Sequence, residues 1–353
     1  MKRIIQLQIL ILFFTILPVD AQEISTDLYS VADTLTDFGL FTRDDIFEIS
    51  LHFDITHYKK KKPKDEYLDA ILTYHISKTD SVNKKIRIKS RGEFRNGYCD
   101  FPPIYLNFKK TDFQKADLDK IEKMKLVTHC QTGNEDYLFK EYLIYKLYNI
   151  LTDTSFRVRL VKISYINTYK KSKPIRSYAF LIEPLDFLAK RINSVPVEVL
   201  TLNQKNIIPE MMDRVAIFNY MIGNTDWSVP NQHNCKVLVE MNTDRPDLGM
   251  IIPYDFDYSG LVNASYAIPA EGLGIESVRQ RVYTGICRSE EVFLNALKEF
   301  AGKKESFYSV ISEFPYLDDR SKKDMIRYLD EFFNGFDKRS SVVYNLKQDC
   351  KDF

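Results

Sequence analysis

The centre of the chain carries the polar segment GNTDWSVPNQHN at residues 223–234 and the tetrapeptide YDFD at residues 254–257. Apolar residues at helical spacing end at Ile222, and Pro209 lies near the expected start of that helix. Between the two segments, apolar runs at 236–239 and 250–253 flank a turn-rich stretch. The pattern predicts a helix, a polar loop, a hairpin and then an acidic pair.

This order predicts that Asp226, one or two asparagines, Asp255 and Asp257 come together. Mg²⁺ prefers such oxygen ligands and usually takes one or two carboxylates together with phosphate oxygens. In kinases an Asp orients the attacking hydroxyl, an Asn about five residues later holds a metal, and an Asp after a hairpin holds metals at the phosphates. Asn231 fits the spacing from Asp226, whereas Asn234 directly precedes the strand, so both are candidate metal ligands. Taken singly, each residue also suits an ordinary turn.

The composition and the first residues bear on location and partners. Lys and Arg number 50 and Asp and Glu 49, which favours neither nucleic acid nor an anionic membrane as a partner. Residues 1–21 have the basic start, short apolar run and small residue at Ala21 of a cleaved signal peptide. We therefore expect export to the periplasm or the outside, with no integral membrane segment after cleavage. Residues 22–45 read as a polar leader.

The remaining residues divide into two parts by pattern. Alternating apolar residues recur in strands between residues 47 and 108, a helix is expected over 138–151, and further strands precede Pro184. We assign residues 46–185 to a β-rich N-lobe. Residues 186–353 read as mostly helical apart from the central hairpin. The predicted fold class is α+β and bilobal, with a ligand cleft between the lobes.

The five cysteines of the mature chain leave at least one thiol unpaired. Within the N-terminal half Cys99 can pair with Cys130, and within the C-terminal half Cys235 can pair with Cys287. Neither pairing is determined by spacing alone.

The quoted motifs resemble the CotH family of atypical, spore-coat-type protein kinases. Its Gly-Asn-Thr-Asp-Trp loop is matched letter for letter at residues 223–227, and its Asp-x-Asp at residues 255–257. The looser matches are Arg-Gly at 91–92, the strand at 104–108, the basic residue opening the helix near Lys140, and a strand that ends in Glu at 180–183. Related loops occur in HipA-type kinases. The likeness spans roughly residues 86–300 and implies a protein-kinase-like fold that binds ATP with Mg²⁺ or Mn²⁺.

The resemblance also implies roles for individual residues. Asp226 would be the catalytic base, with Asn234 or Asn231, Asp255 and Asp257 at the metal. Glu183 would lie at the hinge near the base of the nucleotide. The family usually has Lys residues in and before the strand that here ends at Phe108, so other cations would have to contact phosphate. The candidates are Arg91, Lys89, Lys109 and Lys110.

Three functions remain open from the sequence. The first is an exported kinase that phosphorylates Ser or Thr hydroxyls of a protein with Mg-ATP. The second is a non-catalytic, kinase-like module of the cell envelope that binds a glycan or a protein. The third is a transferase that uses another donor.

Overall fold

The computed structural model describes residues 40–75, 81–108, 121–131, 133, 135–198, 201–337 and 341–352. The signal peptide predicted at residues 1–21 and most of the leader predicted at 22–45 lie outside these ranges. Within them, none of the helices combines the length and the apolar character needed to cross a bilayer.

Seven strands of the described residues close into a barrel in the order β1-β2-β3-β4-β5-β7-β6. Six of the contacts are antiparallel, but β1 and β6 run parallel, from Phe47 opposite Val161 to Phe53 opposite Asn167. That pairing joins the first strand to the sixth and removes the free edges of the sheet. The strands are β1 (Phe47–Phe53), β2 (Leu68–His75), β3 (Ser81–Ser90), β4 (Ile104–Asn107), β5 (Lys123–Thr128), β6 (Val158–Asn167) and β7 (Ile175–Ile182).

The prediction of a bilobal protein-kinase-like fold with an antiparallel β-rich N-lobe is therefore wrong. The β-rich part is a closed barrel that includes a parallel contact, not an antiparallel sheet with one buried face. Alternation of apolar residues reveals which face of a strand is buried but not which distant strand pairs with it. The register between residues 47–53 and 161–167 depends on that long-range pairing.

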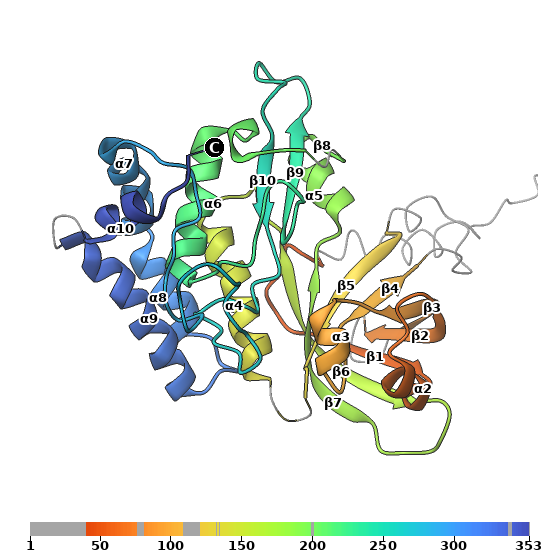
Figure 1. Cartoon of the computed structure of the whole chain (residues 1–353). Helices are drawn as coiled ribbons and strands as arrows, with labels where there is room; N and C mark the ends of the chain where they lie inside the picture. The colour runs from red at the N-terminus through yellow and green to blue at the C-terminus, as the bar shows by residue number, and fades with distance from the viewer. Residues whose placement is uncertain are drawn as a thin grey trace, which may run out of the picture.

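The other elements lie largely beside the barrel (Figure 1). A second sheet has the order β10-β9-β8. The predicted hairpin is confirmed as β9 (Cys235–Glu240) and β10 (Met250–Pro253), and β8 is Ser194–Pro196. The helices are α2 (Ile55–Lys61), α3 (Phe94–Tyr98), α4 (Asp136–Leu151), α5 (Leu185–Arg191), α6 (Pro209–Ile222), α7 (Glu290–Ala301), α8 (Lys304–Ser312), α9 (Asp319–Asp337) and α10 (Ser341–Asp349), with a 3₁₀ turn η1 (Gln204–Asn206).

Two apolar cores hold these parts together. One fills the barrel, where alternate residues of β1 such as Ile49 and Leu51 point inward. The other packs α4 and α6 between the barrel and the remaining helices. Most residues of α4 are buried, as expected for a helix covered on several sides. This position explains how a carboxylate on α4, that of Glu141, becomes fully buried.

Candidate metal and phosphate site

The loop after α6 begins at Gly223, which ends the helix in the left-handed conformation with φ of 67°. A Cβ atom at this position would overlap the hydroxyl of Tyr328. The carbonyl of Gly223 accepts a hydrogen bond of 2.9 Å from the amide of Gly260, and the carbonyl of Ile222 accepts another of 2.9 Å from Leu261. Glycine is therefore needed for both backbone angle and close packing, and the loop start is held firmly.

Asp226 lies in this loop with both carboxylate oxygens engaged. Oδ1 lies 2.8 Å from Nε2 of His233, and Oδ2 accepts a hydrogen bond of 2.9 Å from Nδ2 of Asn234. The Asn234 amide also donates to the Asp226 carbonyl at 2.8 Å. The Asp226 side chain is 36% exposed, so it is both oriented and accessible. A carboxylate with these properties can accept a proton from a bound hydroxyl.

The two asparagine candidates differ in position. Asn234 directly contacts Asp226, whereas Asn231 is exposed and its Oδ1 accepts a hydrogen bond of 3.2 Å from the amide of His233. Among the described contacts, none joins Asn231 to a carboxylate of the site. The geometry therefore places Asn234, and not Asn231, beside Asp226.

The YDFD segment is anchored by its aromatic residue. Phe256 is fully buried, with its ring centroid 4.8 Å from that of Tyr145 and 5.9 Å from that of Phe218. Asp255 has φ of 63°, and its amide donates to the Tyr145 hydroxyl at 2.9 Å. This left-handed residue bends the backbone directly after β10. The bend and the buried ring position both aspartates.

Asp255, Asp257 and Glu141 form an acidic cluster. Each offers a carboxylate oxygen, and these atoms lie within 4.8 Å of one another. Opposite ligands of a cation would be about 4.2 Å apart for Mg²⁺ and up to about 5.2 Å for Ca²⁺. One oxygen, Oε1 of Glu141, is buried without a hydrogen-bond partner among the residues that the structure describes. Oxygen ligands at this spacing, with one left unsatisfied, fit a hard divalent cation.

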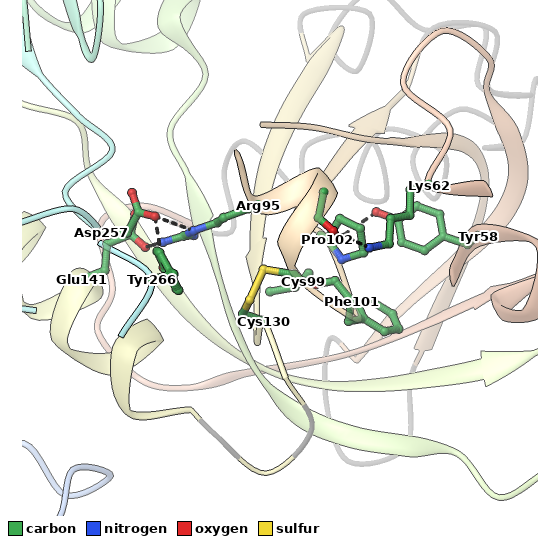
Figure 2. The surroundings of a disulfide bond; sticks show 12 residues. Tyr58, Lys62, Arg95, Cys99, Phe101, Pro102, Cys130, Glu141, Asp257 and Tyr266 are labelled. Atoms are coloured by element: carbon green, nitrogen blue, oxygen red, sulfur yellow. Dashed lines mark hydrogen bonds and ion pairs between the residues drawn. A yellow bond between two sulfur atoms is a disulfide. The ribbon is translucent and has the colours of Figure 1, made fainter. Parts of the chain in front are cut away.

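Arg95 on α3 holds the other side of the cluster (Figure 2). Its Nη2 lies 2.5 Å from Oε2 of Glu141, and its Nε lies 2.7 Å from Oδ2 of Asp257. Tyr266 donates its hydroxyl proton to the same Asp257 oxygen at 3.0 Å. Each of these three charged side chains is at least nine-tenths buried. Arg95 therefore neutralises part of the negative charge while leaving Glu141 Oε1 for another partner.

The disulfide between Cys99 and Cys130 fixes α3 near α4 (Figure 2). Cys99 directly follows α3, and Cys130 lies between β5 and α4. The pairing of Cys99 with Cys130 considered from the sequence is thus confirmed, and the pairing of Cys235 with Cys287 is wrong. Cys287 bonds instead to Cys350, and Cys235 is a buried free thiol.

Burial and neighbouring charges shift the pKa values of the cluster in different directions. Burial raises the pKa of Glu141 to about 8, against the opposing effect of Arg95. Burial likewise raises the pKa of Asp257, again opposed by Arg95. Burial would also raise the pKa of Asp255, but Arg91, Arg95 and other cations outweigh it and hold that pKa below its ordinary value. Asp255 is therefore the member that stays ionised most readily.

Two cations of the barrel face Asp255. Nη2 of Arg91 lies 3.7 Å from Oδ2 of Asp255. The ammonium of Lys125, on β5, lies 4.0 Å from the ring centroid of Tyr254. Burial, reinforced by the charge of Arg91, lowers the pKa of Lys125 to about 7, with Asp255 opposing the shift. Arg91 and Lys125 are thus placed to contact phosphate oxygens of a ligand at the acidic cluster.

Electrostatic effects also connect Asp226 with the acidic cluster. His233, which contacts Asp226, is among the side chains near enough to Asp255 to lower its pKa, after Arg91, Arg95 and Lys125. Burial, followed by the charges of Asp257 and Asp226, raises the pKa of Tyr258 to about 12. The carboxylates of Asp226 and Asp257 therefore both raise the pKa of Tyr258. The two segments are adjacent along the backbone, because the Tyr254 amide donates a hydrogen bond of 2.9 Å to the Asn234 carbonyl, but no described hydrogen bond or ion pair joins Asp226 to Asp255 or Asp257.

Two predicted nucleotide contacts are not joined to this site. Lys109 lies outside the described residues. Glu183 is buried at the end of β7, and both its oxygens are held by Arg191 at 3.0 and 2.8 Å. It also accepts a hydrogen bond of 3.1 Å from the amide of Arg157. No described contact connects Glu183 with the acidic cluster.

Sequence reasoning missed Arg95, Lys125, His233 and Tyr266, and did not place Glu141 at the metal. The alternation of Lys123, Lys125 and the apolar residues between them was a strand signal for β5. Arg95 lies on a helix of 5 residues and Tyr266 in a loop, both too short to show a periodic pattern, and only the packing brings them to Asp257.

The chain matches no model of a known protein family, and no curated protein matches it.

Proposed function

We propose that this protein transfers a phosphoryl group from a nucleoside triphosphate to the hydroxyl of a protein Ser or Thr residue, with Mg²⁺ or Mn²⁺ bound. The observation that carries the proposal is the acidic cluster of Glu141, Asp255 and Asp257. Arg91 approaches that cluster. The oriented carboxylate of Asp226 and the cluster residue Asp257 both raise the pKa of Tyr258. The letter-for-letter likeness of residues 223–227 to the CotH loop also supports it.

Different residues bind the cation and the phosphate groups of the donor nucleotide. Asp255, Asp257 and Glu141 supply oxygen ligands for the cation, whereas the amide nitrogen of Asn234 donates to Asp226. A divalent cation at this position neutralises phosphate charge. Arg91 and Lys125 contact phosphate oxygens from the barrel side. Arg95 keeps Glu141 and Asp257 in place as a positioning residue.

Asp226 acts on the acceptor. The hydroxyl oxygen bonds to the terminal phosphorus while the bond from that phosphorus to the bridging oxygen breaks. The electron pair of the broken bond leaves with the nucleoside diphosphate, and the hydroxyl proton passes to the Asp226 carboxylate. His233 and Asn234 hold that carboxylate in one orientation, which lowers the cost of reaching the reactive geometry.

The test is metal-dependent binding of nucleotide to the mature protein, measured by calorimetric titration. We expect ATP to bind more tightly with Mg²⁺ or Mn²⁺ than without a divalent ion. Asp255→Asn should lose that dependence, because it removes a ligand charge. Asp247→Asn, an exposed residue of the β9–β10 turn, is the matched control and should bind like the parent. Equal binding with and without the cation in the parent protein would contradict the proposal.

One observation favours a second candidate, a non-catalytic module that binds an envelope glycan or protein. Phe94 and Tyr98 on α3 are each 42% exposed, with ring centroids 5.4 Å apart and an interplanar angle of 22°. Exposed aromatic pairs commonly mark interaction surfaces. For this candidate, the double change Phe94→Ala and Tyr98→Ala should abolish retention on envelope polysaccharide, whereas Tyr169→Ala, which is 71% exposed, should not. Metal-dependent nucleotide binding would be absent.

A further inference from the structure

A row of cations runs along the outer face of β3, away from the acidic cluster. The inward side chains of this strand, such as Ile86 and Ile88, are buried in the barrel, so the residues between them face outward. The row ends two residues before Arg91, whose Nη2 lies 3.7 Å from Oδ2 of Asp255. The outward cations of β3 are Lys85, Arg87 and Lys89.

The pairing of the strands adds further cations to this face. Residues directly opposite each other in antiparallel strands point to the same side of the sheet. The register places Lys125 of β5 in line with Lys89, with one residue of β4 between them. Lys123 of β5 is in line with Arg87 in the same way. We call this surface the basic face, and its cations are Lys85, Arg87, Lys89, Lys123 and Lys125.

The charge of the basic face is unbalanced. Among the paired, outward positions of β2 to β5 that the structure describes, one is acidic, Asp69 opposite Arg87. No ion pair joins those two side chains, and Nε of Arg87 is buried without a hydrogen-bond partner among the described residues. Lys89 and Lys123 also make no ion pair with a residue that the structure describes. The face therefore carries a net positive charge that the described residues do not neutralise.

Spacing and aromatic contacts favour a polypeptide over a nucleic acid as the ligand. Alternate side chains of a strand are about 7 Å apart, and so are those of an extended peptide, so acidic residues at alternate positions can meet the cations of β3 one by one. A single nucleic-acid strand needs free aromatic faces for its bases. The Tyr67 ring is engaged instead by Arg87 and Lys89, at 5.0 and 5.2 Å from its centroid. Arg91 lies 5.7 Å from the centroid of Tyr105.

We infer that the basic face binds an acidic segment of the acceptor polypeptide, beside the Ser or Thr residue that receives the phosphoryl group. The inference rests on the proposed function for the identity of this partner as the acceptor. A chain that leaves the acidic cluster past Arg91 meets Lys89 next and then Arg87, so the segment and the hydroxyl can be bound together. Opposite charges on the two partners also speed their encounter at low salt.

The experiment measures binding of labelled synthetic peptides to the whole mature protein by fluorescence anisotropy at constant ionic strength. One peptide has Glu at alternate positions beside a Ser, and the other has Gln in place of each Glu. We expect saturable binding of the Glu peptide and none of the Gln peptide. The double variant Arg87→Gln, Lys123→Gln should bind the Glu peptide roughly three- to tenfold more weakly, the loss expected for two ion pairs at a surface.

The matched control is the double variant Lys170→Gln, Lys171→Gln, which removes the same charge from the exposed β6–β7 turn and should bind like the parent. Equal weakening in this control overturns the inference, because overall charge would then explain the binding. If the Arg87→Gln, Lys123→Gln variant does not fold, the exposed change Lys123→Gln alone decides: weaker binding supports the basic face, and parental affinity overturns it.

Nucleotide and divalent ions are left out, so a protein that transfers no phosphate can still bind the Glu peptide. A parent that binds nucleotide with its cation but binds the Glu peptide no better than the Gln peptide overturns this inference and leaves the proposed function standing. Single-stranded oligothymidine of the same net charge is the third probe. Tighter binding of the oligonucleotide than of the Glu peptide, weakened by Arg87→Gln, Lys123→Gln, would overturn the assignment of a polypeptide as the ligand.

Discussion

The ring nitrogen Nε2 of His233 lies 2.8 Å from Oδ1 of Asp226. Because Asn234 donates to the other oxygen, the carboxylate has little freedom to rotate. The same imidazole is close enough to Asp255 to lower the pKa of that side chain. His233 thus touches the candidate base and influences a candidate metal ligand.

Asp226→Asn is expected to slow phosphate transfer by about 10²- to 10⁴-fold, the range for loss of a general base. His233→Gln should cause a smaller loss in kcat with little change in the KM for nucleotide, since it only loosens the orientation of Asp226. Both are measured with labelled nucleotide and a Ser/Thr-rich protein acceptor. Asp226→Asn that transfers phosphate at the parental rate would exclude Asp226 as the base.

Arg95→Met should lower the free energy of unfolding by about 3–5 kcal/mol, because it leaves the buried carboxylates of Glu141 and Asp257 without their partner. Chemical denaturation without metal measures the change. Arg245→Met breaks an exposed pair with Glu210 and should cost about 1 kcal/mol or less. Adding Glu141→Gln to Arg95→Met should recover part of the loss. A cost equal to that of the exposed control would mean that Arg95 does not hold the cluster.

The Cys99–Cys130 disulfide closes 31 residues and should contribute about 3–4 kcal/mol on loop entropy. Replacing both cysteines by Ala should also weaken Mn²⁺ binding, because α3 then holds Arg95 less firmly. The matched control replaces Cys287 and Cys350, which close 63 residues far along the chain from the site. We expect that control to lose comparable stability and to keep parental Mn²⁺ affinity. Equal loss of Mn²⁺ affinity in both variants would show that the position of α3 does not control metal binding.

Gly223→Ala combines a left-handed backbone with a steric overlap, whereas Gly272→Ala has a φ of 82° and open space around it. A left-handed backbone at a residue with a Cβ atom lowers the free energy of unfolding by about 1–2 kcal/mol. Gly272→Ala should therefore cost about that much, and Gly223→Ala clearly more, with a loss of nucleotide binding as the loop shifts. Thermal unfolding of the two variants side by side gives the comparison. Similar melting temperatures would show that the Tyr328 side chain moves aside without loss of stability.

The affinity for nucleotide should depend on pH through the ammonium group of Lys125. Its pKa of about 7 means that the ammonium form, which attracts phosphate, is lost as pH rises from 6 to 9. Metal-free nucleotide affinity of the parent should therefore fall over this range relative to Lys125→Arg, which keeps its charge throughout. Comparing the two proteins cancels the titration of the nucleotide itself. A constant affinity ratio between them from pH 6 to 9 would show that Lys125 does not contact the phosphates.

The local parts of the site could be read from the residues alone. Pro209 begins α6 and Gly223 ends it, as the helix signals predicted, and the hairpin β9–β10 follows where apolar runs flank a turn. Asp226, Asn234, Asp255 and Asp257 stand on these local elements, so their places in the loop and directly after the hairpin were predictable from their order. Helix caps, turns and short hairpins depend on residues close together along the chain, which is why the sequence by itself determines them.

Only the tertiary structure decided the rest. Closure of the barrel depends on β1 meeting β6 across more than a hundred residues, which the alternation of Ile49 and Leu51 does not encode. Arg95 reaches Glu141 and Asp257 because a short helix, a disulfide and a buried helix meet at one point. The choice of Asn234 over Asn231 likewise follows from where the backbone turns. Burial and long-range pairing set these contacts, and both arise from packing between distant segments rather than from any local pattern.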